Sequence, residues 1–173
     1  MILIISGTNR PGSNTLKVAN YYLENLLKIT SDVELLNLES LPPTLIASDM
    51  YGKRSEDFEV IQQKILKADK FIFIIPEYNG SFPGILKTFI DCCKFPISFL
   101  GKKAALVGVS SGKYGNIRGV EHFTGICNYI GITVFPTRLH IADINTELNE
   151  MMQLHKTPTV DFVDDQIKRF LNF

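Results

Sequence analysis

The sequence lacks an excess of charge of either sign. Its 173 residues include 18 Lys and Arg against 18 Asp and Glu. A protein that binds phosphate backbones or anionic lipid surfaces is expected to carry a positive field. The balanced charge gives no support to such a role, so we expect neither nucleic acid nor a membrane as a partner.

No apolar run approaches the roughly 20 residues that a bilayer-spanning helix requires. The apolar start of the chain, Ile2–Ile5, has no basic residue before it, which is typical of a first strand and not of a signal peptide. Cysteine is also scarce: Cys92, Cys93 and Cys127 are odd in number, and no pair has the C-x-x-C spacing. We therefore expect reduced core thiols and a cytoplasmic protein.

Histidine is equally sparse, and His122, His140 and His155 have no carboxylate or cysteine at the spacing of metal ligands. We expect no metal site.

The chain does contain a regular alternation of short apolar runs and longer helical periods, in a composition that is 45% hydrophobic. Nearly continuous apolar runs are typical of strands covered on both faces. The predicted strands are Ile2–Ser6, Val33–Leu38, Phe71–Pro76, Ala104–Val109 and Ile132–Ile141. The predicted helices are Asn14–Ile29, Ser55–Lys67, Pro83–Lys94, Ile117–Ile130 and Pro158–Leu171, the last with Thr157 as its N-cap.

Five βα units in series predict a doubly wound α/β fold, with a parallel sheet and helices on both faces. The stretches Glu39–Gly52 and Ala142–Lys156 are predicted to be loops, and residues 1–173 to form a single domain. In such sheets ligands bind outside the carboxyl ends of the strands, where the strand order reverses. The loops after the first, third and fourth strands are therefore the candidate site.

The loop after the first strand, Ser6–Thr15, gathers hydroxyls, glycines and Arg10 at the start of a helix. Free N–H groups and the helix dipole make such a place an anion site. The loop lacks the lysine of a P-loop and the G-x-G-x-x-G of a dinucleotide-binding turn, so NTP hydrolysis and ordinary Rossmann binding are not expected. A phosphate monoester fits the donors present, which are Thr8, Arg10, Ser13, Asn14 and Thr15.

The loop after the third strand places two prolines around a short turn: Pro76-Glu77-Tyr78-Asn79-Gly80 is followed by Pro83-Gly84-Ile85-Leu86-Lys87. A stiff loop of this kind can direct successive N–H and C=O groups at one edge of a planar ligand such as a flavin. The two segments together resemble the signature of the NADPH-dependent FMN reductase family. The typical first loop of that family, Gly-Ser-x-Arg-x-x-Ser, is matched by Gly7–Ser13 with Thr8 in place of Ser.

The resemblance implies a flavodoxin-like fold with five parallel strands in the order 2-1-3-4-5. It implies an oxidoreductase of the FMN, quinone or azo reductase kind, which binds FMN and takes hydride from NADPH or NADH for a small-molecule acceptor. In the loop after the fourth strand, it places Ser111, Gly112, Tyr114 and Gly115 by the flavin ring. The full set of expected FMN-binding residues is Thr8, Arg10, Ser13, Asn14, Thr15, Pro76, Glu77, Tyr78, Asn79, Gly80, Ser111, Gly112, Tyr114 and Gly115. No side chain is expected to act as a catalytic residue, because the cofactor carries the chemistry.

Two other functions remain open at this point. Gly108–Gly112 is a literal G-x-S-x-G, and Ser110, Asp143 and His155 follow the Ser…Asp…His order of α/β-hydrolase esterases. Against an esterase, Lys113–Asn116 delays the helix that should follow the nucleophile directly. The other alternative is a non-catalytic FMN-binding or electron-transfer module.

The segment Phe95–Leu100 is unusually apolar for a connection between a helix and a strand. We interpret it as a self-complementary patch that closes a two-fold contact. The resembled family forms dimers and often tetramers, so a homodimer or homotetramer is expected, with Phe99 in the contact.

Overall fold

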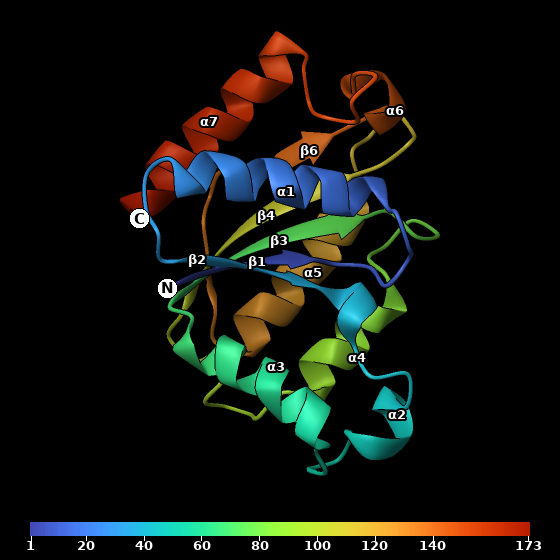
Figure 1. Ribbon diagram of the computed structural model, residues 1–173, viewed down its shortest axis with the longest axis vertical. Helices are drawn as coiled ribbons and strands as arrows, with labels where there is room; N and C mark the ends of the chain where they lie inside the picture. The colour runs from blue at the N-terminus through green and yellow to red at the C-terminus, as the bar shows by residue number, and fades with distance from the viewer.

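Apolar residues on both faces of the long strands require that helices cover the sheet on both sides. The computed structural model describes residues 1–173 and shows this arrangement (Figure 1). The strands are β1 (Ile2–Ser6), β2 (Val33–Asn37), β3 (Lys70–Pro76), β4 (Lys103–Val109), β5 (Thr133–Val134) and β6 (Leu139–Ile141). The helices are α1 (Asn14–Leu27), α2 (Leu45–Ser48), α3 (Glu56–Lys67), α4 (Gly84–Cys92), α5 (Ile117–Tyr129), α6 (Ile144–Glu147) and α7 (Thr157–Leu171), with a 3₁₀ turn at Leu38–Ser40.

All strand pairs are parallel, in the order β2-β1-β3-β4-β5, and β6 also pairs with β4. This order, with helices on both faces, confirms the predicted flavodoxin-like fold. Leu3 and Ile5 belong to a core with α3, α4 and α5, whereas Ile2 and Ile4 belong to a second core with α1 and α7. The strand period of two thus sends alternate residues of β1 into the two cores. No helix combines the length and the apolar character that a transmembrane segment needs.

The fifth strand differs from the prediction, because Ile132–Ile141 is not continuous. β5 pairs with the start of β4 and β6 with its end, so the sheet has six strands. Pro136 lies in the gap and cannot donate a ladder hydrogen bond. The carbonyl of Thr137 instead accepts a bond of 2.9 Å from the buried Gln166 side chain of α7.

The two predicted loops and some helix ends also differ. Glu39–Gly52 contains the end of the 3₁₀ turn and α2, and Ala142–Lys156 contains α6. Helix α7 begins at Thr157, with Lys156 in the N-cap position and Pro158 in the first turn, so the predicted cap is one residue late. Such one-residue differences are usual at helix ends.

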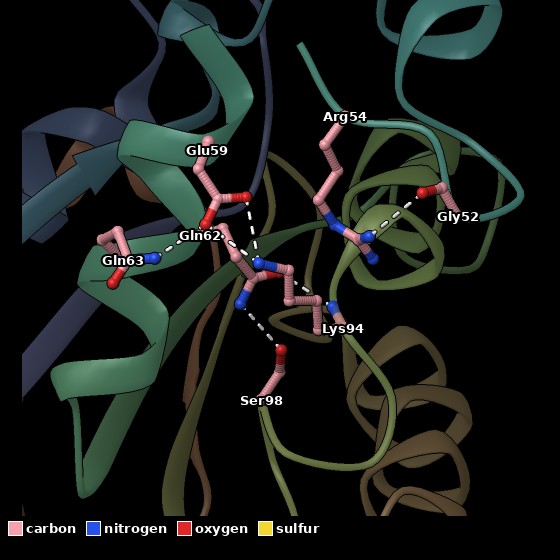
Figure 2. A network of polar contacts seen from close by, with 7 residues as sticks. All are labelled: Gly52, Arg54, Glu59, Gln62, Gln63, Lys94 and Ser98. Carbon is pink, nitrogen blue, oxygen red and sulfur yellow. Dashed lines mark hydrogen bonds and ion pairs between the residues drawn. The ribbon is translucent and has the colours of Figure 1, made fainter. Parts of the chain in front are cut away.

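The segment between α4 and β4 is held against α3 by polar contacts, which Figure 2 shows from close by. The Gln62 side chain donates to Ser98 Oγ at 3.0 Å and accepts the Lys94 N–H at 2.8 Å. Lys94 Nζ lies 2.9 Å from Oε1 of Glu59, which belongs to α3 as Gln62 does. These bonds fix which side chains of the segment point inward.

Phe99 is 3% exposed and belongs to the core, whereas Phe95, Ile97 and Leu100 are 70%, 58% and 62% exposed. Its predicted place in a subunit contact is therefore wrong. The Phe99 ring packs on Phe71 with 5.6 Å between ring centroids. Phe95, Ile97 and Leu100 remain at the surface, together with Pro96.

The three cysteines are unpaired and buried, as predicted for core thiols. Burial raises the pKa of the Cys92 thiol to about 11 and that of Cys127 to about 12. Burial also raises the pKa of Cys93 well above its ordinary value. A reactive thiolate is therefore disfavoured at all three positions.

Candidate functional site

A cleft of about 380 Å³ opens at the carboxyl ends of β1, β3 and β4. Its volume lies in the range of roughly 300–1,000 Å³ that small-molecule sites occupy. Arg10 and Glu77 supply the only charges of the lining. The lining residues are Thr8, Arg10, Pro11, Gly12, Ser13, Asn14, Thr15, Pro76, Glu77, Tyr78, Val109, Ser110, Ser111, Ile144 and Asn145.

The first wall of the cleft is the loop between β1 and α1. Ser13 is the N-cap of α1, and its hydroxyl oxygen accepts the Leu16 N–H at 3.2 Å. The N–H groups of Asn14 and Thr15, in the first turn, have no intrahelical acceptor, and the dipole of α1 adds positive potential there. Thr15 is only 2% exposed and still lines the cleft. This wall is therefore suited to an anionic group.

Thr8 joins this wall to the next one. Its hydroxyl lies 2.9 Å from the Tyr78 hydroxyl, across 70 residues of chain. The same Thr8 oxygen accepts the backbone N–H of Arg10 at 3.2 Å. The loops after β1 and β3 are thus connected through side chains that both face the cleft.

The second wall, after β3, is built on a tight turn. Tyr78 and Ser81 exchange backbone hydrogen bonds of 2.9 and 3.1 Å, while Asn79 and Gly80 have φ values of 53° and 76°. Two left-handed central residues are typical of a type I′ turn, which Asn-Gly favours. Ser81 Oγ also lies 2.9 Å from Nδ1 of His122 on α5. The wall is thereby fixed both within itself and to a helix.

The third wall is the start of the loop after β4. Ser110 and Ser111 line the cleft, and the Glu77 N–H donates to the carbonyl of Val109 at 2.9 Å, which links the second and third walls. Tyr114 is 73% exposed, whereas Gly115 is buried beside His140.

Nine of the residues predicted from the sequence come together in this lining: Thr8, Arg10, Ser13, Asn14, Thr15, Pro76, Glu77, Tyr78 and Ser111. Asn79, Gly80, Gly112, Tyr114 and Gly115 belong to the same loops but do not line the cleft. The first two form the turn that supports Tyr78, and Gly115 packs under its loop.

A fourth wall was not anticipated from the sequence. Ile144 and Asn145 of α6 line the cleft, and Asn145 Oδ1 accepts a bond of 2.9 Å from the Asn14 side chain. Ala142–Lys156 was predicted to be a loop, because the four residues of α6 are too few to show the hydrophobic period of a helix. The cleft lining also includes Pro11, Gly12, Val109 and Ser110, which are chain neighbours of predicted residues.

The esterase residues do not form a catalytic arrangement. The Ser110 hydroxyl donates to the carbonyl of Gly112 at 2.8 Å, and His155 Nδ1 pairs with the carbonyl of Glu147 at 3.0 Å. Asp143 uses its N–H to cap the Gly112 carbonyl at 3.0 Å. No hydrogen bond joins any two of the three side chains, so a serine nucleophile has no base here.

Comparison with known proteins gives a consistent result. Residues 1–146 match the family described as NADPH-dependent FMN reductase. The chain is 29% identical over 136 residues to a 2-hydroxy-1,4-benzoquinone reductase from a Burkholderia species, covering 77% of this chain and 73% of that protein. It is 30% identical over 180 residues to the FMN-dependent NADPH-azoreductase of Staphylococcus saprophyticus, covering 96% and 94%.

Among solved structures, the flavoenzyme FerB, an NAD(P)H:(acceptor) oxidoreductase from Paracoccus denitrificans, is similar with a TM-score of 0.79. The match covers 99% of this chain and 94% of that one, at 22% identity. At this identity the likeness shows a shared fold.

Proposed function

We propose, from the premise that this chain belongs to the NADPH-dependent FMN reductase family, that its cleft holds FMN for the reduction of a quinone or azo acceptor. Membership makes the protein an oxidoreductase that uses FMN and a nicotinamide donor. We further propose where FMN binds, which class of acceptor it reduces and how the chain assembles.

The observation that carries the proposal is the joint position of three loops around one cleft. The α1 end offers free N–H groups, three hydroxyls and Arg10, which suit a phosphate monoester. The other end lies between the loops after β3 and β4, where backbone groups are held close together. A ligand with a phosphate at one end and a planar ring system at the other fits these two ends of the cleft.

The residues of the chain would act by binding and orientation. Arg10 and the start of α1 would hold the phosphate, and the turn Tyr78–Ser81 would keep the Pro76–Tyr78 backbone rigid against the ring edge. Bound FMN supplies the two-electron chemistry, accepting hydride from the nicotinamide and passing electrons to the acceptor. No side-chain nucleophile or general base is required.

The acceptor class follows from the relatives, whose names specify a benzoquinone and azo compounds. We further propose that residues 1–173 form one domain in the cytoplasm. In support of a single domain, all six strands belong to one sheet and α7 packs back onto it.

The test is spectroscopic and then kinetic. Purified protein, as isolated or after addition of FMN, should show flavin absorption. In the absence of oxygen, it should oxidise NADPH or NADH over many turnovers only when a quinone or an azo dye is supplied. Unchanged FMN fluorescence on titration with micromolar protein would show that the cleft does not bind the cofactor. FMN binding without any acceptor-dependent turnover would support a non-catalytic module instead.

We also propose that the protein assembles as a homodimer or homotetramer through an apolar patch of Phe95, Ile97, Leu100 and Tyr129. These side chains are between 58% and 85% exposed. Phe95 and Tyr129 line one groove of about 440 Å³ between α4 and α5, and Leu100 packs at Gly131 just beyond α5. Burying such a patch against a second copy is favoured by the hydrophobic effect.

A further inference from the structure

Asn116 combines a buried amide side chain with a left-handed backbone conformation at the start of a helix. It is 1% exposed, has a φ of 59°, and is the N-cap of α5. Both ends of its amide are used: Oδ1 accepts the Gly119 N–H at 3.1 Å, and Nδ2 donates to the carbonyl of Ile75 at 3.0 Å.

The amide of Asn116 occupies space that is left free by the glycine at position 119. A Cβ at Gly119 would lie 2.2 Å from Asn116 Oδ1, so only glycine leaves room there. A glycine inside a helix costs roughly 1 kcal/mol relative to alanine. The helix therefore carries a destabilising residue at the one position where the amide of Asn116 needs space.

Asn116 and its acceptor Ile75 each adjoin one wall of the cleft. Ile75 immediately precedes Pro76, which begins the second wall, and Asn116 ends the loop whose first residues form the third wall. A second contact holds the loop after β4 at Gly115, the residue before Asn116: His140 Nδ1 donates to the Gly115 carbonyl at 3.2 Å. The amide therefore joins the end of the loop after β4 to the residue that precedes the second wall.

We propose that Asn116 is a positioning residue: it holds the end of the loop after β4 against the residue that precedes the Pro76–Tyr78 wall, as the Glu77–Val109 hydrogen bond holds the start of that loop, and it thereby sets the binding and environment of the flavin ring. The inference rests on the proposed function. Asn116 does not line the cleft, so it acts through the backbone of the two loops.

Two single variants test this by different routes. Asn116→Gly keeps the left-handed backbone accessible and removes the amide, whereas Gly119→Ala leaves Asn116 in place and drives its amide away through the 2.2 Å clash. Each should weaken FMN about tenfold, the ratio that corresponds to 1.4 kcal/mol. Both should change the visible circular dichroism of the bound flavin in the same sense.

The double variant gives the decisive comparison. The three atoms nearest to a methyl group at position 119 all belong to the Asn116 amide. With that amide absent, FMN should bind to Asn116→Gly/Gly119→Ala no more weakly than to Asn116→Gly. Asn116→Asp retains an N-cap acceptor but loses the donor to Ile75, and should also weaken FMN. Gly125→Ala, on the same helix as Gly119 and with nothing within 4 Å of its new Cβ, is the matched control and should change neither quantity.

Additive losses in the double variant would overturn the proposal. So would folded variants with lower melting temperatures but wild-type FMN affinity and visible circular dichroism, because the amide would then be a structural cap only. If the wild-type protein binds no FMN at all, the proposed function fails, and this result is distinct from either of the others.

Discussion

At the scale of single residues, Arg10 is the basic side chain of the cleft lining and lies exposed in the loop between β1 and α1. If it pairs with the FMN phosphate, Arg10→Ala should weaken FMN by about 1.5–3 kcal/mol, the scale of a hydrogen bond to a charged group. Titration of flavin fluorescence measures this loss.

Riboflavin supplies the control for Arg10, because it has the same ring and no phosphate. It should bind to the wild type and to Arg10→Ala with equal affinity. A parallel loss for both ligands would mean that Arg10 acts on the fold of the loop.

The predicted residues that the structure brings together in the cleft are mostly those whose chemistry can be read locally. Hydroxyls beside Arg10 at a helix start indicate an anion site by their type and spacing, and all of them line the cleft. Asn116 gives no such signal, since its two partners lie 41 residues before it and three after it. Phe99 was misjudged for a related reason: the polar contacts that turn its segment inward come from α3.

At the scale of elements, α1 and α3 begin with equivalent caps that differ only in location. Ser13 and Ser55 each accept the N–H of the residue three positions later at 3.2 Å. Ser13→Ala and Ser55→Ala should each lower the free energy of unfolding by about 1 kcal/mol. Only Ser13 lines the cleft, so only its removal should also weaken FMN.

Chemical denaturation of both variants, followed by FMN titration, separates the two contributions. Equal FMN affinity in the two variants would show that the Ser13 hydroxyl does not bind the phosphate and serves only as a helix cap.

Long strands and helices were predictable because their burial repeats over many residues. The four strands β1 to β4 follow the predicted apolar runs to within one residue at each end. The interruption between β5 and β6 was missed although Pro136 within the run indicates it. The bond from Gln166 of α7 to the Thr137 carbonyl, which satisfies the backbone in the gap, could not be read from the local sequence. Helix α6 was missed because a single turn carries no period, although it forms one wall of the cleft.

At the scale of the whole molecule, the apolar patch predicts an assembly that can be broken by charge. Phe95→Glu places a carboxylate where a second copy would cover the ring, and the dissociation constant should rise at least about tenfold. Light scattering over a dilution series measures the change. Phe162→Glu, at a similarly exposed phenylalanine on α7, should leave the mass unchanged.

Phe99→Glu would not serve this purpose, because it buries a charge in the core and should unfold the protein. A monomeric mass for the wild type at micromolar concentration would contradict the assembly, without affecting the flavin assignment.

The broken fifth strand has a consequence for how this molecule can meet its neighbours in a crowded solution. A long, flat edge strand offers a row of unpaired backbone groups on which another sheet can grow. Here that border is reduced to segments of two and three residues, separated by a stretch that contains a proline. The same interruption therefore weakens the template for misassembly at this edge of the sheet, and leaves the five residues of β2 as the longer exposed border.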